Sequence, residues 1–296
     1  MASAARGVFI VAAKRTPFGA FGGKLAEKTC VDLQEVAAKA ALAAGNVDPS
    51  IVDSAVIGNV ISIVPALTVN RLCGSGFQSV VNAAQEILVG DSNVVLTGGT
   101  DNMSQAPFMA RNIRFGTRLG ADYKLEDSLW TSLTDFHCKT PMGVTAENLG
   151  RKIRNNERRG RGLRLASQQN WAAANQEGRF KAEISPVMLK IKGKEVQFDT
   201  DEHPRPQTTK ESLAKLPSVF KKTGTVTAGT ASGISDGAGA VIVASEDAIK
   251  QHGLKPLARL VSYGVAGVEP TIMGSAQFPR SSGRFKLEES PSTTST

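Results

Sequence analysis

The sequence predicts an α/β fold in which parallel strands are joined by helices. The strongest observation is a strand–helix–strand succession: a strand at 65–70, apolar residues at helical spacing from Phe77 to Leu88, and a strand at 94–96. Such a succession is typical of a parallel βαβ unit with a right-handed crossover. A second observation is the apolar run at 238–244, which predicts another buried strand. Ser245 follows it as a predicted N-cap, with two acidic residues in the first turn of the next helix.

The elements before this unit alternate in the same way. Residues 8–13 form an apolar run that ends at a Thr-Pro pair and several glycines, which predicts a first buried strand. A helix rich in Ala, Leu and Glu is predicted over 32–43, and a second strand over 55–57.

The middle of the chain, about 101–217, is a long region of mixed signals between the strands of the core. Within it, the pattern predicts an amphipathic helix over 167–180 and a hairpin over 186–198. A further strand is predicted over 257–261. The tail at 275–296 has no period and ends in Ser and Thr, which is typical of a disordered segment.

Composition limits the function classes. With 296 residues, 41% hydrophobic and 21% charged, the chain has the make-up of a globular protein, and its apolar runs are too short to span a bilayer. The three cysteines, with no C-x-x-C pair, argue against a structural zinc site and a disulfide framework, and favour a reducing compartment. The net charge of +8 is compatible with nucleic acid, an anionic membrane or a phosphate-bearing small molecule. Residues 1–26 contain no acid, which is typical of mitochondrial targeting segments, but the favoured interpretation of the run at 8–13 is a first strand; the two are compatible if the segment is not cleaved.

Cys73 is the main candidate for chemistry. It stands where the strand at 65–70 gives way to a helix, whose free N–H groups and dipole favour the thiolate, the nucleophilic form. Gly74 and Gly76 allow a tight turn, so the arrangement parallels the nucleophile elbow of hydrolases. The alternative, taken from the residues alone, is an inert buried cysteine.

At this point the sequence resembles the thiolase family. The segment 70–76, Asn-Arg-Leu-Cys-Gly-Ser-Gly, is similar to the family's acyl-accepting cysteine motif. Further motifs agree in order from about residue 6 to 274, and the most similar type is the mitochondrial 3-ketoacyl-CoA thiolase of fatty-acid β-oxidation. These motifs lie at 13–19, 98–104, 145–148, 205–209, 224–229 and 231–238.

The resemblance implies a layered α-β-α half with a mixed, mainly parallel sheet and helices on both faces, plus a loop and helix insertion. It implies an N-terminal thiolase domain over 6–253, with 101–217 as the loop region, and the start of a second domain over 254–274. The implied activity is that of an acetyl-CoA C-acyltransferase, with an acyl thioester on Cys73 and no permanently bound cofactor, because coenzyme A is a substrate. It also implies homo-oligomers, a mitochondrial matrix location, and neither a nucleic-acid partner nor a bound metal.

The resemblance also carries over residues that contact coenzyme A. Arg205, Thr208 and Ser232 match the family's CoA contacts, and Phe220 and Ala228 match residues lining the CoA slot. An arginine suits a phosphate, and hydroxyls suit the pantetheine arm. Without the resemblance, Arg205 would be interpreted as a solvated charge.

The chain also departs from the family. The family's second half supplies a histidine that activates the nucleophile and a second catalytic cysteine, and neither motif occurs here; the histidines are His137, His203 and His252. The resemblance stops near residue 274, so we expect the second half to be missing. Between residues 58 and 65 a helix and loops of the family are absent, which predicts an internal gap.

These departures leave three interpretations open. The first is a thiolase-type acyltransferase that is weakly active or inactive on its own. The second is a non-catalytic protein that binds CoA or pairs with complete thiolases. The third is binding of nucleic acid through the arginine-rich stretch 151–164, which lacks interleaved aromatics and a recognised RNA motif.

Overall fold

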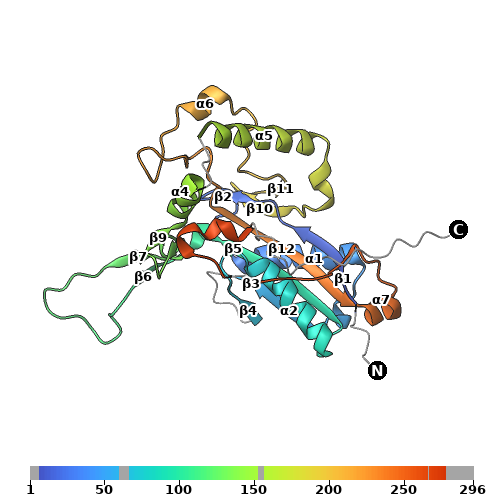
Figure 1. Ribbon diagram of the computed structural model, residues 1–296. Helices are drawn as coiled ribbons and strands as arrows, with labels where there is room; N and C mark the ends of the chain where they lie inside the picture. Colours follow the sequence, from blue (N-terminus) through green and yellow to red (C-terminus); the bar gives the residue numbers. More distant parts are fainter. Residues whose placement is uncertain (1–6, 60–66, 153–156, 266, 278–296) are drawn as a thin grey trace.

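The computed structural model describes residues 7–59, 67–152, 157–265 and 267–277, and its centre is a seven-stranded sheet (Figure 1). The strand order is β13-β1-β12-β5-β3-β4, with β2 also paired to β12. The strands are β1 (Val8–Arg15), β2 (Gly19–Ala20), β3 (Ser54–Gly58), β4 (Leu67–Val69), β5 (Val94–Asn102), β12 (Ser235–Ser245) and β13 (Ala258–Arg259).

The sheet is mixed, as expected. β3 is parallel to both of its neighbours, β4 and β5, whereas β12 is antiparallel to β1, β2 and β5. Strands β1, β3, β4 and β5 therefore share one direction, and β12 and β13 run against it. The prediction of a mainly parallel sheet is confirmed in that most of its strands run in the same direction. Its central pairings are nevertheless antiparallel, because β12 returns to the middle of the sheet from the opposite end.

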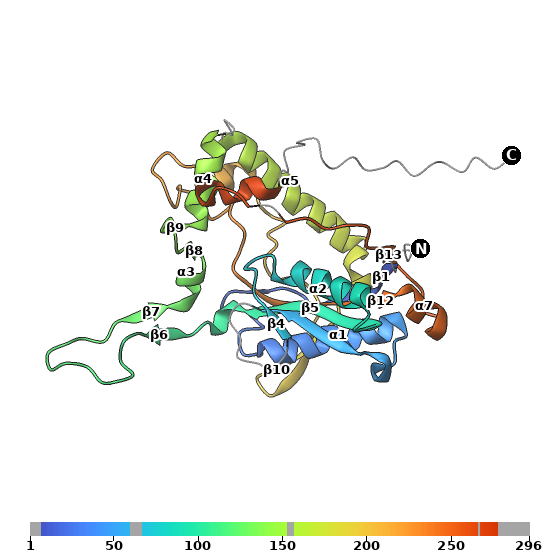
Figure 2. The same cartoon turned by 60° about the horizontal axis from the view of Figure 1, so that its bottom comes forward.

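Helices cover both faces, which confirms the layered arrangement (Figure 2). α1 (Cys30–Gly45) buries Leu33 in a cluster that also contains Ile242 of β12. α2 (Ser75–Val89) buries Ile87 on the other face, in a cluster with Val243. Neighbouring residues of β12 thus serve opposite faces, as the two-residue period of a strand requires. Each such large apolar side chain contributes about 1.5–3 kcal/mol on burial.

The helix ends have physical causes that the sequence carries. Thr29 caps α1 in a capping box with Asp32, and Asn46 ends the helix in a left-handed conformation with φ of 50°. Ser245 caps α7 (Glu246–His252), with its Oγ accepting from the Ala248 N–H at 3.1 Å, so this prediction is confirmed. The βαβ unit is also confirmed in the described residues, as β4, α2 and β5, with β3 between the two strands.

The region between β5 and β12 contains short elements around two longer helices and the predicted hairpin. The hairpin is confirmed, and its turn residues Lys192 and Gly193 both have positive φ. An arm formed by β6 and β7 projects from the body in both views (Figures 1 and 2). The helices and strands of this region are β6 (Phe108–Ala110), β7 (Leu125–Asp127), α3 (Ser128–Ser132), β8 (Thr134–Asp135), β9 (Thr140–Pro141), α4 (Met142–Lys152), α5 (Glu157–Gln176), β10 (Val187–Ile191), β11 (Lys194–Phe198) and α6 (Lys210–Ala214). The 3₁₀ turns η2 (Met103–Gln105) and η3 (Arg179–Ala182) lie in the same region, and η1 (Pro49–Ile51) and η4 (Pro270–Gln277) lie outside it.

Three predicted boundaries were wrong. The helix predicted over 167–180 is α5, which begins at Glu157 because arginine favours helices even without an apolar period, and Gly178 in a left-handed conformation separates it from η3. The strand predicted over 257–261 is reduced to the two residues of β13, and η4 extends to Gln277, into the predicted tail. The predicted gap near residue 60, residues 153–156 of the basic stretch and residues 278–296 lie outside the described residues. The side chains of residues 157–161 also lie outside the described part of the structure.

The domain limits stay predictions, but β13 joins the sheet by pairing with β1, and η4 packs against α4. In the described part of the chain, no helix is long and apolar enough to cross a membrane.

Candidate active site

Cys73 lies exposed in the turn between β4 and α2. The turn is held by its own backbone. The Arg71 carbonyl accepts from the Gly74 N–H, and the Leu72 carbonyl accepts from the Ser75 N–H, both at 3.0 Å. The Ser75 hydroxyl donates to the same Leu72 carbonyl at 2.6 Å. The thiol is therefore presented to solvent by a rigid turn, and the alternative of a buried, inert cysteine is wrong.

The residue before Cys73 adopts an unusual backbone conformation. Leu72 has φ of 49°, in the left-handed region that L-residues avoid at a cost of about 1–2 kcal/mol. The Asn70 side chain stabilises it by accepting from the Leu72 N–H at 2.9 Å. The sharp turn confirms the expected likeness to a nucleophile elbow. The strain at Leu72 had no sequence signal, because glycine or asparagine is the residue expected at such a φ.

The start of α2 is seated directly on the sheet. A Cβ on Gly58 of β3 would lie 2.7 Å from the Gly76 nitrogen, so only glycine leaves room for this approach. Buried Ser79 fixes the next turn by accepting from the Gly98 N–H of β5 at 3.1 Å. The first full helical bond runs from the Gln78 N–H to the Gly74 carbonyl, so the N–H groups of the first turn point out of the helix end beside Cys73.

Arg205 is exposed in the loop between β11 and α6. One terminal nitrogen, Nη1, donates to the carbonyls of Glu202, His203 and Pro204 at 2.7, 3.1 and 3.0 Å. Among the described residues, its Nε and Nη2 have no hydrogen-bond partner, so donors remain for a phosphate. Its backbone N–H donates to the side chain of Gln168 on α5 at 2.7 Å.

The other CoA candidates lie nearby along the chain. Thr208 is half-buried and donates through Oγ1 to the Arg205 carbonyl at 2.6 Å. Ser232 and Ala228 are exposed in the loop that precedes β12. The ring of Phe220 packs over Gly143 of α4, where any side chain would overlap it.

Topology brings the cysteine and these loops to the same end of the sheet. Asp236, near the start of β12, pairs with Asn102 at the end of β5. β12 therefore begins where β3 and β5 end, which is the end at which α2 starts. His203 joins the two loops, with its Nε2 lying 2.8 Å from the Ile234 carbonyl oxygen.

The sequence analysis gave no role to Glu147, although it lies in one of the quoted motifs. This carboxylate is 5% exposed and accepts from the Thr225 N–H at 2.8 Å and the Val226 N–H at 2.7 Å. The Thr225 hydroxyl donates to it at 3.2 Å. Glu147 thus ties the loop after Phe220 to α4. No local sequence signal marks Glu147, because its partners Thr225 and Val226 lie 78 and 79 positions further along the chain.

The remaining titratable groups have structural surroundings. No hydrogen bond joins a histidine to Cys73 in the described residues, and His252 ends α7 as expected. Burial raises the pKa of the Cys30 thiol, although the Asn102 N–H donates to its sulfur at 3.2 Å. Within the described ranges, no cluster of three or more His, Cys, Asp or Glu side chains could hold a metal ion.

Comparisons with known proteins identify the family. The family described as "Thiolase, N-terminal domain" matches residues 8–64 and 62–247. Human mitochondrial 3-ketoacyl-CoA thiolase is 56% identical over 301 aligned positions, which include 95% of this chain and 76% of that protein. The alignment is longer than this chain, so it contains positions that the chain lacks, and the family match breaks at 62–64, where the gap was predicted.

Solved structures agree. A crystal structure of the human mitochondrial enzyme superposes with a TM-score of 0.89 at 56% identity, covering 92% of this chain and 74% of that one. A second crystal structure of the human enzyme, in complex with CoA, gives a TM-score of 0.86 at 56% identity, with 91% and 72% covered. The predicted resemblance is confirmed: the chain belongs to the thiolase family.

Proposed function

We propose that this chain is a thiolase-type acyltransferase of fatty-acid β-oxidation, in which Cys73 accepts the acyl group of a 3-ketoacyl-CoA. The Cys73 thiolate attacks the keto carbon, and the bond between that carbon and the α-carbon breaks. The bonding electrons leave with the α-carbon, which takes a proton to give acetyl-CoA. The thiol of free CoA then attacks the Cys73 thioester and releases the shortened acyl-CoA, which regenerates the cysteine.

The observation that carries this proposal is the exposed thiol at the start of α2. The N–H groups of the first helical turn would stabilise an oxygen that develops negative charge during the attack. The turn is fixed by hydrogen bonds, so the thiol requires no rearrangement before it attacks.

Coenzyme A enters this scheme as a substrate, and no permanently bound cofactor is needed. Arg205 would meet a phosphate of the nucleotide with its remaining donors, Thr208 and Ser232 would bond polar groups of CoA, and Phe220 and Ala228 would line the slot. The human relative carries "mitochondrial" in its name, which supports a location in the mitochondrial matrix. A homo-oligomer, built as in the family, completes the proposal.

Turnover by this chain alone should be slow. The 296 residues contain neither the family's activating histidine motif nor its second catalytic cysteine motif. Loss of a general base commonly lowers the rate by about 10²–10⁴-fold. We therefore expect both the acylation of Cys73 and the release of its acyl group to be slow.

Mass spectrometry tests this directly. The purified chain is incubated with a 3-ketoacyl-CoA, digested, and searched for an acyl adduct on the peptide with Cys73; Cys73→Ser is the active-site variant and Cys138→Ser the matched control. We expect an adduct on the wild type and on Cys138→Ser alone. No adduct on the wild type, or an adduct that survives in Cys73→Ser, would contradict the proposal.

A second candidate is a protein that binds CoA, or pairs with a complete thiolase, without catalysis. The observation favouring it is that no histidine is hydrogen-bonded to Cys73 in the described residues. It predicts CoA binding or co-purification with a full-length thiolase, together with no acyl adduct. The same adduct measurement therefore separates the two functions.

A further inference from the structure

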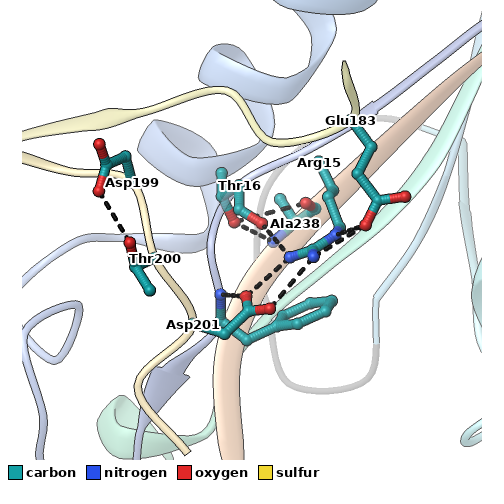
Figure 3. A network of polar contacts seen from close by, with 8 residues as sticks. Arg15, Thr16, Glu183, Asp199, Thr200, Asp201 and Ala238 are labelled. Carbon is teal, nitrogen blue, oxygen red and sulfur yellow. Dashed lines mark hydrogen bonds and ion pairs between the residues drawn. The ribbon is translucent and has the colours of Figure 1, made fainter. Parts of the chain in front are cut away.

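An arginine at the end of β1 anchors the segment that leads to Arg205 (Figure 3). The Arg15 guanidinium bonds the Asp201 carboxylate through two nitrogens, Nη1 to Oδ1 at 2.7 Å and Nη2 to Oδ2 at 3.1 Å. Its Nε donates to Glu183 Oε1 at 2.9 Å. This fork geometry fixes both the distance and the plane of the Asp201 side chain.

The pair is sheltered from water. The side chains of Arg15 and Asp201 are 16% and 10% exposed, and the guanidinium lies 4.8 Å from the centre of the Phe18 ring. A second ring, Phe180, is 5.8 Å away. In such surroundings a charge pair is screened far less than at the surface, and removal of one partner leaves the other charge buried alone.

The next residue extends the attachment. The Glu202 N–H donates to the Phe18 carbonyl at 2.9 Å. Its carboxylate oxygen Oε2 accepts from the Ala20 N–H at 2.9 Å and the Lys24 N–H at 3.1 Å. Asp201 and Glu202 together therefore attach this segment to residues 15–24, and we call this attachment the clip.

The clip ends at the candidate CoA residues. His203 reaches the Ile234 carbonyl, two residues beyond Ser232, and the Arg205 guanidinium folds back onto the carbonyls of Glu202 and His203. Any displacement of Asp201 would pass through this short segment to Arg205 and, through His203, to the Ser232 loop.

We propose that Arg15 is a positioning residue for coenzyme A, which through Asp201 holds Arg205 and Ser232 in register without touching the ligand. This inference rests on the proposed CoA-binding role of those two residues. The backbone of Arg15 is held separately, because its N–H donates to the Glu183 carbonyl at 3.0 Å and its carbonyl accepts from the Ser185 N–H at 2.7 Å. Removing the side chain should therefore release the clip while β1 keeps its place.

The test compares two acyl donors that differ in the part Arg205 would hold. Acetyl-CoA carries the nucleotide phosphates, whereas S-acetylpantetheine has the same thioester and arm without them. The second-order rate constant for acylation of Cys73 is measured with each donor, alongside CoA affinity by calorimetry and thermal melting, in Arg15→Lys, Arg15→Ala and Asp201→Asn. Arg111→Ala is the matched control, because Arg111 pairs with Glu126 in an exposed ion pair on the β6–β7 arm.

We expect the acetyl-CoA rate and the CoA affinity to fall by about 10- to 100-fold in Arg15→Ala and Asp201→Asn, as small misplacements of binding groups do. The S-acetylpantetheine rate should fall by a smaller factor, because that donor keeps the arm that Ser232 would contact but has no nucleotide for Arg205 to hold. Arg111→Ala should match the wild type with both donors.

The outcomes separate the inference from the function beneath it. A wild-type chain that does not bind CoA refutes the proposed function. Variants of a CoA-binding wild type that keep its preference for acetyl-CoA refute the positioning role. Equal losses with both donors mean that the pair only supports folding, which also overturns the inference. Should Arg15→Ala fail to fold, Arg15→Lys and Asp201→Asn decide, since both keep a polar side chain in place.

Discussion

Replacing Glu147 by alanine should release the loop that follows Phe220. The Glu147 carboxylate is buried on α4 and accepts from the backbone N–H groups of Thr225 and Val226 and from the Thr225 hydroxyl. No other bond to those two N–H groups occurs among the described residues. The variant therefore leaves two half-buried donors without an acceptor among the described residues.

The magnitude follows from those two donors. A fully buried donor left unsatisfied costs about 1–3 kcal/mol, so about 2–6 kcal/mol is the upper bound on the loss of unfolding free energy in Glu147→Ala, whose two donors are half-buried. The lower part of this range is expected, because the loop can move and take up water. Glu147→Gln keeps one acceptor oxygen but turns an NH₂ group toward the second donor, so about 1–3 kcal/mol should be lost.

Two measurements check this. Urea titration gives the free energy of unfolding, with the exposed Glu246→Gln, an i,i+4 partner of Lys250, as the control that should change it little. Trypsin cleavage after Lys221 and Lys222 reports the loop itself, and Glu147→Ala should be cut there much faster than the control. The reasoning is refuted if Glu147→Ala unfolds like the wild type and its loop resists trypsin equally well.

Three further predictions concern the nucleophile and the helices. Gly58→Ala places a Cβ against the start of α2, so it should lower the free energy of unfolding by about 1–3 kcal/mol and slow acylation of Cys73. Gly162→Ala has open space around it and should stabilise α5 by up to about 1 kcal/mol. Urea titration and adduct formation check both variants, and the same result for the two would contradict this account. At neutral pH, iodoacetamide should label exposed Cys73 well before Cys30, because burial raises the pKa of the Cys30 thiol and lowers its thiolate fraction. The difference between the two labelling rates should narrow as the pH rises. Peptide mapping measures both rates, and equal rates at pH 7 would contradict the prediction. Thr29→Ala removes the N-cap of α1 and should lower the free energy of unfolding by about 1 kcal/mol. Urea titration measures this, and an unfolding midpoint equal to that of the wild type would contradict it.

Local patterns predicted much of the fold. The apolar runs at 8–13 and 238–244 predicted β1 and β12, whereas the run at 94–96 predicted only the first part of β5. The helical period after Cys73 predicted α2, which buries Val81, Ala84 and Ile87. These signals depend on neighbours in the chain, so they can be read without knowing the tertiary structure. The pairing of β12 between β1 and β5 could not be predicted from them, because it joins segments more than a hundred residues apart.

The site was predicted unevenly for the same reason. Cys73 has a local motif around it, so its turn was predictable. The strain at Leu72 was not, since it arises from closing the turn over Asn70 and Ser75 rather than from residue preference. Arg15 and Glu147 act through partners distant in sequence, and charged residues with distant partners look like solvated charges until the chain is folded.

The central place of β12 has a consequence for how the chain is made. β12 is the twelfth strand in chain order, yet both β1 and β5 depend on it for their hydrogen bonds. At a synthesis rate of about 5–20 residues per second, roughly 7 to 30 s pass between completion of β5 and completion of β12. During that time the growing polypeptide on the ribosome carries two open strand edges and one helix on each side of an unfinished core. The central sheet therefore cannot close during synthesis until residue 245 has been added.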